Sequence, residues 1–282
     1  MVPNLTRGES CLSYIVIKCG GSVLDKLPDT FYKNIVELME QYHLKPIVVH
    51  GGGPVVSNLL QTLDVQTTFV NGMRVTTEEI LDVVEMGLSG IVNKKIVREI
   101  TAQNGRAIGL SGVDNMTLEA EPLASNQKLG YVGQVASVHL TGLNALLDKG
   151  IIPVLSPLAV DQQGQRWNIN ADLAAAAVAT TMQASLYMIT DVDGVLHQDT
   201  LVPKLSAKEA EEMIDSGAIY GGMIPKVQAA LNSIEAGVRK VVILNGAEKN
   251  SLMDFFIEEK TGTVFESVQR RNKQTVAEEA SN

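Results

Sequence analysis

The sequence is poor in cysteine, in aromatic residues and in long apolar runs. Cys11 and Cys19 are its only cysteines among 282 residues, and two residues so placed give neither a disulfide framework nor a zinc site. There is no run of about 18 apolar residues and no signal-peptide pattern, so we expect neither a membrane span nor export. No cluster of Lys and Arg stands out and the net charge is −9, which argues against nucleic acid or an anionic membrane as a partner. We expect a cytoplasmic protein.

What the sequence does contain is a 45% apolar content, enough for the core of one large α/β domain or of two lobes that share a sheet. The β-branched run 14–17 is typical of a buried parallel strand, and it leads directly into Lys18, Gly20 and Gly21. Ligands bind at the carboxyl ends of such strands, and glycine lets main-chain N–H groups surround an anion. Taken alone, the pattern also fits an ordinary strand-to-loop turn with a lysine that reaches solvent.

A second strand, at residues 46–50, ends in the same way in three glycines at 51–53. Pro54 then favours the first turn of a helix, so the glycines lie at a helix N-terminus, where unpaired amides favour an anion. Two such loops in one sheet predict a phosphate site with two walls. Neither loop matches the nucleotide fingerprints GxxxxGK[ST] or GxGxxG.

The spacing of apolar residues between these two strands predicts a crossover helix, and hence a parallel sheet. Residues 116–139 change to short β-prone pieces, which we interpret as hairpins laid like a lid over the ligand edge, and residues 158–167 predict a further hairpin. Gly87, Ser89 and Gly90 interrupt a long helix, where small residues favour a tight helix contact or a subunit interface.

Three later segments carry polar groups at strand or helix ends. Asp172 opens an alanine-rich helix, either as a plain cap or as a functional carboxylate, and Asn168 and Asn170 before it offer amide donors and acceptors. The acidic loop 191–194 follows a strand and fits ribose, magnesium or a lysine partner, or a simple Asp-Gly turn. Lys226 lies in the first turn of a helix, where a cation is unfavourable and therefore indicates a function.

Six motifs in this order resemble the amino acid kinase family, and the resemblance runs from about residue 14 to 265. They are KCGG at 18–21, VHGGGP at 49–54, NGMRVT at 71–76, NINAD at 168–172, TDVDG at 190–194 and GGMIPK at 221–226. The family's fold is an α/β fold, a three-layer α/β/α sandwich around a mainly parallel sheet of about eight strands. We therefore expect that fold here.

Within the family, the resemblance is to the members that act on N-acetyl-L-glutamate. It implies ATP-dependent phosphorylation of the side-chain carboxylate to N-acetyl-L-glutamyl 5-phosphate, a step of arginine biosynthesis, with Mg²⁺ held mainly through ATP and no metal ligand from the protein. Two alternatives remain. One is a family member with another acceptor, such as carrier-linked aminoadipate, glutamate, aspartate, carbamate or uridylate, and the other is a non-catalytic sensor.

The resemblance also implies the role of each site residue. The catalytic set is Lys18, Lys226 and Asp172, in which Asp172 pairs with both lysines. The acceptor would be bound by Gly52, Gly53, Arg74, Asn168 and Asn170. The nucleotide would be bound by Gly20, Gly21, Asp191, Asp193, Gly194, Ile219, Tyr220, Gly221 and Gly222.

By the same resemblance, residues 14–165 form a lobe for the acyl amino acid and residues 166–266 a lobe for ATP. The polar segment 267–282 is expected to be disordered. Residues 1–13 are too short for the additional N-terminal helix that joins arginine-inhibited family members into hexamers, since about 12 to 15 residues are needed for even a marginal helix. We expect a homodimer that arginine does not inhibit.

Overall fold

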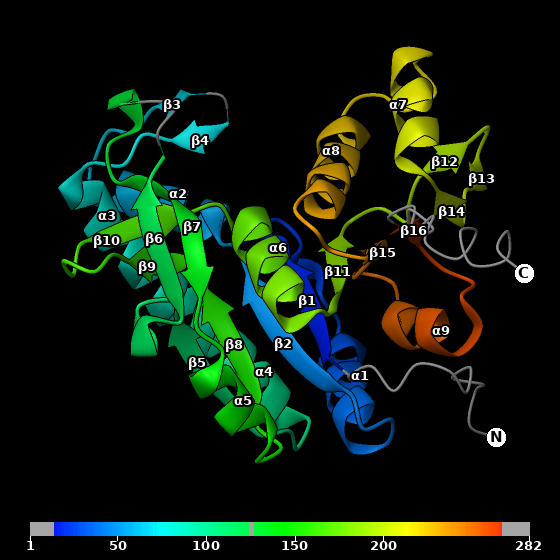
Figure 1. Ribbon diagram of the computed structural model, residues 1–282, viewed down its shortest axis with the longest axis horizontal. Coiled ribbons are helices and arrows are strands. Elements are labelled where there is room, and N and C mark those ends of the chain that lie inside the picture. The colour runs from blue at the N-terminus through cyan, green and yellow to red at the C-terminus, as the bar shows by residue number, and fades with distance from the viewer. Residues whose placement is uncertain (1–13, 71, 124–126, 267–282) are drawn as a thin grey trace, which may run out of the picture.

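The computed structural model describes residues 14–70, 72–123 and 127–266, and one eight-stranded sheet crosses the whole molecule (Figure 1). The predictions for residues 1–13 and 267–282 lie outside the described residues. The strands in spatial order are β14 (Lys204–Leu205), β16 (Thr263–Glu266), β15 (Lys240–Asn245), β11 (Ser185–Thr190), β1 (Tyr14–Cys19), β2 (Lys45–His50), β8 (Ile152–Ser156) and β5 (Ala107–Ser111).

Every neighbouring pair in this sheet is parallel except β15 with β16. The central strand β1 is buried on both faces, because Val16 points into one hydrophobic cluster while Ile15 and Ile17 point into another. A strand covered on both faces needs the continuous apolar run that its sequence shows. Lys18 and His50 therefore reach the same carboxyl edge of the sheet from neighbouring strands.

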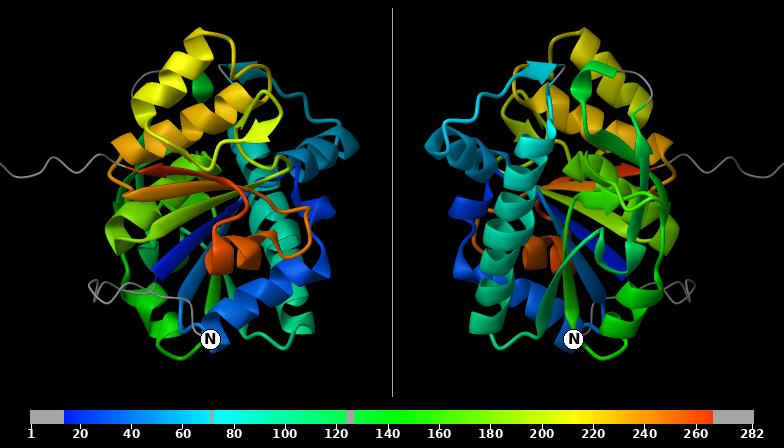
Figure 2. Two further views of the ribbon diagram at one scale, coloured as in Figure 1. Left: turned by 90° about the vertical axis from the view of Figure 1, so that its right-hand side faces the viewer. Right: turned by 90° about the vertical axis from the view of Figure 1, so that its left-hand side faces the viewer.

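Helices cover both faces of the sheet, so the predicted three-layer sandwich is confirmed (Figure 2). One face is packed by α5 (Thr141–Leu147), α6 (Ala171–Met182) and α8 (Met223–Glu235). The other face is packed by α1 (Asp29–Glu40), α4 (Asn93–Ala102) and α9 (Ser251–Glu258). The remaining helices are α2 (Gly53–Thr62), α3 (Glu78–Glu85) and α7 (Ala207–Asp215), with short 3₁₀ turns at Leu24–Lys26, Asp114–Met116 and Gln127–Leu129.

The two predicted hairpin regions join into one closed four-stranded barrel, which the sequence did not indicate. The barrel consists of β6 (Leu118–Pro122), β7 (Val132–Val138), β9 (Leu158–Val160) and β10 (Arg166–Ile169). The predicted lobe boundary at residue 166 falls at the start of β10, the last of these strands. The described residues also form two small antiparallel sheets of two strands each. These are β3 (Phe69–Val70) with β4 (Met73–Arg74), and β12 (Leu196–His197) with β13 (Thr200–Leu201).

The long helix after residue 76 is interrupted by a π-helical segment, η2 (Met86–Val92), between α3 and α4. Thr77 caps the helix by accepting a hydrogen bond from the Ile80 amide. A Cβ added to Gly87 would lie 3.0 Å from Val56 of α2, whereas one added to Gly90 would meet nothing within 4 Å. The small residue at position 87 therefore serves a tight intrachain helix contact. Within the described residues, no helix is both long and apolar enough to span a membrane.

Candidate active site

The two glycine-rich loops meet at the carboxyl edge of the sheet. The Gly51 amide donates to the Cys19 carbonyl at 2.9 Å. A Cβ on Gly21 would lie 2.8 Å from the Gly52 nitrogen and 2.9 Å from the Gly53 nitrogen. Only a glycine fits at position 21, because any side chain there would collide with the Gly52 and Gly53 main chain. The two predicted walls of an anion site therefore lie in contact, and the site itself stays a prediction.

Lys18 forms an ion pair with Asp172 at this junction. Its Nζ lies 2.7 Å from Asp172 Oδ1, and the lysine side chain is only 14% exposed. Asp172 is not the cap of helix α6, because the Asn170 side chain accepts from the amides of Asp172 and Leu173 at 2.8 and 3.3 Å. The carboxylate is thus left to hold the lysine, while the first turn of α6 favours its negative charge.

Lys226 pairs with a different carboxylate from the one predicted. Its Nζ lies 3.3 Å from Asp191 Oδ1, and Lys26 approaches the other oxygen of Asp191 at 3.4 Å. The reason is topological. Asp191 directly follows β11, the neighbour of β1, so it lies between α8 and the first glycine loop. The pKa of Asp191 is lowered from its ordinary value, and the hydrogen bond from Lys226 is the largest cause.

The two catalytic candidates Lys18 and Lys226 line one cavity of about 180 Å³, together with Gly20, Asp172 and Asp191. Two cations that line one small cavity suit a phosphate group. The cavity adjoins the contact between the two glycine loops. A phosphoryl group placed here would meet Lys18 and Lys226 together.

The other predicted nucleotide residues lie around the start of α8 and the end of β11. Asp193 accepts from the Asn245 side chain at 2.7 Å, and Gly194 has a φ of +141° with no room for a Cβ beside Thr263. The three other residues are Tyr220, which is 75% exposed, and Gly221 and Gly222, which face open space.

Ile219 differs from these neighbours, because its side chain is buried in the core. Only its main chain could face a nucleotide.

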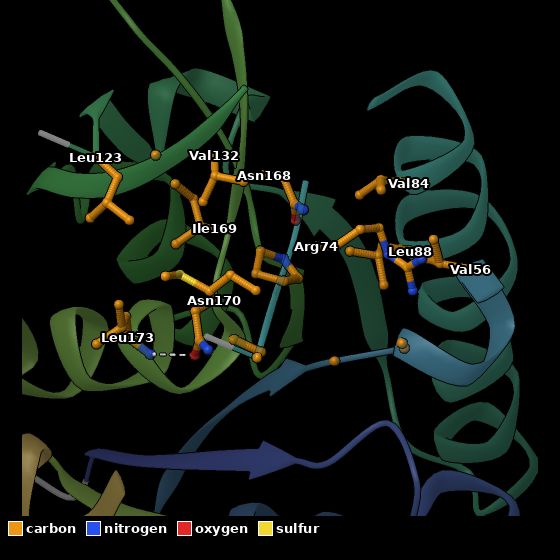
Figure 3. Close-up of a pocket in the computed structure, with 18 of the residues that line it drawn as sticks. Val56, Arg74, Val84, Leu88, Leu123, Val132, Asn168, Ile169, Asn170 and Leu173 are labelled. Carbon is orange, nitrogen blue, oxygen red and sulfur yellow. Dashed lines mark hydrogen bonds between the residues drawn. The ribbon is translucent and has the colours of Figure 1, made fainter. Parts of the chain in front are cut away.

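A second cavity, of about 410 Å³, borders the second glycine loop (Figure 3). It is lined by Gly51, Gly52, Gly53, Val56, Phe69, Gly72, Met73, Arg74, Val84, Leu88, Leu123, Val132, Gly133, Pro157, Asn168, Ile169, Asn170, Ala171 and Leu173. The barrel supplies Asn168 from β10, and Arg74 lies beside residues of α2 and η2. Most of the lining is apolar, with a few polar groups, as small-molecule sites usually are.

Arg74 is the cation of this cavity. Its guanidinium donates to Ser57 at 2.8 Å and to Thr67 at 3.2 Å, and it lies 4.6 Å from the centre of the Phe69 ring. Burial lowers the pKa of Arg74, which remains fully charged near neutral pH. Its partners are neutral throughout the part of the chain that the structure describes, so a carboxylate ligand would supply the missing counter-charge.

Asn168 donates from Nδ2 to the Thr76 hydroxyl at 3.1 Å. That contact orients the amide and leaves its carbonyl oxygen able to accept from a ligand N–H. The side-chain oxygen of Asn170 caps α6 and is therefore not free to bind a ligand. Asn170 instead lines the cavity and helps to position Asp172.

The family of the chain follows from comparison with known proteins. The model of the amino acid kinase family matches residues 13–245. The chain belongs to the amino acid kinase family. An acetylglutamate kinase of Oceanobacillus iheyensis is 41% identical over 257 residues, which cover 90% of this chain and 97% of the relative. One from Geobacillus kaustophilus is 48% identical, over 82% of this chain and 90% of the relative. Among solved structures, smu.665 of Streptococcus mutans UA159 superposes with a TM-score of 0.76 at 29% identity, covering 91% of this chain and 99% of that one.

In this member of the amino acid kinase family, sequence reasoning missed the residues that orient the predicted ones. Ser57 and Thr67 hold Arg74, and Thr76 holds Asn168. Ser57 lies four residues after Gly53, one helical turn further along α2, so it shares a face with the glycine loop. That spacing was the available signal. Thr67 and Thr76 carry no comparable pattern.

Proposed function

We propose that this protein catalyses ATP-dependent phosphorylation of the side-chain carboxylate of N-acetyl-L-glutamate, giving N-acetyl-L-glutamyl 5-phosphate, in arginine biosynthesis. The observation that carries the proposal is that an arginine-containing cavity is lined by the second glycine loop and a two-lysine cavity by the first, and that the two loops are in contact. The acetylglutamate kinases that align with most of the chain support the same substrate.

The acceptor cavity fits the parts of N-acetylglutamate. Arg74 would bind the α-carboxylate bidentately, as guanidinium groups do. Asn168 would accept from the acetamido N–H, and apolar side chains such as Val132 and Leu173 would surround the acetyl methyl. The side-chain carboxylate would then extend past Gly52 toward the lysines.

The reaction joins one carboxylate oxygen of the acceptor to the γ-phosphorus of ATP and breaks the bond from that phosphorus to the β–γ bridging oxygen, which leaves with ADP. A glutamate-type carboxylate has a pKa of about 4.3, so it is already ionised at neutral pH and needs no general base. The task of the protein is to bring two anions together. Lys18 and Lys226 would stabilise the charge on the transferring group, and Asp172 and Asp191 would position them.

ATP would be held by the glycine amides, by Lys18 and Lys226, and by the main chain that leads into α8. Mg²⁺ would neutralise charge on the phosphate oxygens. Both carboxylates of the lysine cavity are already in ion pairs, and no cluster of three potential metal ligands is found among residues 14–70, 72–123 and 127–266. The residues therefore fit an ion carried mainly by ATP oxygens and water. The homodimer and the cytoplasmic location stay predictions.

The test is to incubate the protein with ATP, Mg²⁺ and a panel of acceptors, and to trap acyl phosphate as hydroxamate with hydroxylamine. We expect strong turnover with N-acetyl-L-glutamate alone. Free glutamate should react poorly, because its α-ammonium brings a second positive charge into a cavity that already contains Arg74. Comparable rates with glutamate or aspartate would refute the substrate assignment.

A further inference from the structure

A fully buried histidine lies directly beneath the second glycine loop. His50 is the last residue of β2 and has no exposed surface. One ring nitrogen, Nδ1, lies 2.9 Å from the Gly51 carbonyl oxygen, and the other, Nε2, lies 3.2 Å from Nδ2 of Asn93. Neither the chemistry proposed above nor the predicted site residues use this histidine.

The surroundings of Asn93 determine which nitrogen of His50 carries the proton. Asn93 Nδ2 also faces two carbonyl oxygens, of Val154 at 2.8 Å and of Leu110 at 3.1 Å, and the Lys94 ammonium donates to Asn93 Oδ1 at 3.1 Å. These contacts fix Nδ2 as a donor whose two hydrogens are shared among three acceptors, so His50 Nε2, which faces it, carries no proton. The Gly51 carbonyl oxygen can only accept, so it requires a proton on the other ring nitrogen. The proton is then on Nδ1, which donates to the Gly51 carbonyl. Burial lowers the pKa of His50 to about 4, so the ring is neutral at physiological pH.

The hydrogen bond to Gly51 sets the direction of the next amide. In a trans peptide the C=O and the following N–H point in opposite directions. Because the Gly51 carbonyl points down to His50, the Gly52 N–H points away from the core. The Gly52 nitrogen would be 2.8 Å from a Cβ on Gly21, which places it where the two glycine loops meet. This is the junction between the acceptor cavity and the lysine cavity.

The π-helical segment η2 holds the same loop from the side. A Cβ on Gly52 would lie 2.6 Å from Leu88 and 3.0 Å from Val92. Asn93, the partner of His50, follows Val92 directly. π-helical insertions occur frequently at functional sites. Here one interrupted helix both packs against Gly52 and supplies the side chain that selects the tautomer of His50.

We infer that His50, held as the Nδ1–H tautomer by Asn93, is a positioning residue for phosphoryl transfer, which directs the Gly52 N–H toward the transferring phosphoryl group. The inference rests on the proposed function. Its effect belongs to the transition state, where charge on the phosphoryl oxygens develops, so loss of the hydrogen bond lowers kcat more than it changes either KM.

Two substitutions of His50 separate its two nitrogens. The amide nitrogen of Asn can take the place of Nδ1, so His50→Asn keeps a donor for the Gly51 carbonyl. The end of a Gln side chain reaches the place of Nε2, so His50→Gln keeps the contact with Asn93 and loses the donor. We expect the kcat of H50N to exceed that of H50Q by about tenfold or more, with the KM values for both substrates within about threefold. His197→Gln, the same change at an exposed histidine, is the matched control and leaves kcat unchanged.

Thermal unfolding of both variants, measured alongside, checks that the two folds are equally intact. A wild-type protein that forms no hydroxamate from N-acetyl-L-glutamate refutes the proposed function and this inference with it. An active wild type with equal kcat values for the two variants refutes the inference alone.

A measurement on the unmodified protein tests the tautomer even if both variants fail to fold. The chain has four histidines, so nitrogen NMR of the imidazole rings can resolve them. We expect His50 to show a protonated Nδ1 and a bare Nε2, without titration between pH 6 and 8. A protonated Nε2, or titration in that range, overturns the inference.

Discussion

Replacing Arg74 tests whether the larger cavity binds the acceptor. The guanidinium is held by Ser57 and Thr67, which use two of its five N–H groups and leave the others for a ligand. Lysine at this position keeps the charge but offers a single point of contact, and alanine removes both. Because these contacts form equally in the ground state and the transition state, their loss raises the KM for N-acetyl-L-glutamate and changes kcat little.

The magnitude follows from the number of contacts that are lost. A hydrogen bond to a charged group contributes about 1.5–3 kcal/mol. Arg74→Lys loses one of the two contacts of a bidentate pair, or about 2 kcal/mol, which is about a 30-fold rise in KM. Arg74→Ala loses both, or about 4 kcal/mol, which is about a thousandfold.

The assay is hydroxamate formation, with N-acetyl-L-glutamate varied at saturating ATP and then ATP varied at saturating acceptor. The KM for ATP should stay within about threefold of wild type, because Arg74 does not line the lysine cavity. Arg106→Lys is the control, since Arg106 is exposed and donates to the Lys149 carbonyl. If Arg74→Lys lowered kcat and left the KM for the acceptor unchanged, the placement of the α-carboxylate would be incorrect.

Three further predictions concern catalysis, packing and pH. Lys226→Ala should lower kcat about a hundredfold with little change in the KM for the acceptor, because its charge acts on the transferring phosphoryl group; steady-state kinetics within threefold of wild type would exclude that role. Gly112→Ala should lower the free energy of unfolding by about 2 kcal/mol or more, since a Cβ there would lie 2.2 Å from a main-chain oxygen. Gly90→Ala, where a Cβ meets open space, should raise the free energy of unfolding by about 0.5–1 kcal/mol. Urea unfolding that ranks the two variants the other way would contradict the packing. Burial lowers the folded-state pKa of His50 from 6.5 to about 4. The unfolded chain therefore binds the proton more readily, and the contribution of His50 to the free energy of unfolding is fully present above pH 6.5. That contribution, on the order of 3 kcal/mol, is lost as the pH falls toward 4. His50→Asn should lack that part of the acid dependence in urea unfolding, and an identical dependence in both proteins would show that His50 does not cause it.

The central sheet could be predicted from the sequence because its signals are local. Runs such as 14–17 and 46–50 are apolar without interruption, which is typical of strands covered on both faces. The barrel could not be predicted in the same way. Strand β9 pairs with β6 and β10 pairs with β7, through residues that lie about 36 to 41 positions apart (Val160 with Glu119, Asn168 with Val132). Alternation along a strand does not identify so distant a partner. The π-helical segment η2 was equally hidden, since Gly87 and Gly90 indicated only a close helix contact.

Much of the candidate site follows from chain order, because parallel strands bring their carboxyl ends to one edge. Lys18, Gly21 and the loop at 51–53 come together for that reason. The partner of Lys226 did not follow, since it depends on which strand lies next to β1. The sheet order places β11 there, and Asp191 at its end takes the role that was expected of Asp172.

This pairing explains how Lys226 can lie in the first turn of α8 against the helix dipole. The carboxylate of Asp191 offsets the unfavourable position at 3.3 Å. Lys18, Lys26 and Lys226 face only Asp172 and Asp191 in these ion pairs, so three lysines against two aspartates leave an excess of one positive charge. A triphosphate carries several negative charges. In the reaction proposed above, main-chain amides such as that of Gly52 and a Mg²⁺ ion carried by the nucleotide would supply the rest of the neutralisation. The direction of a single glycine N–H is therefore expected to affect the rate.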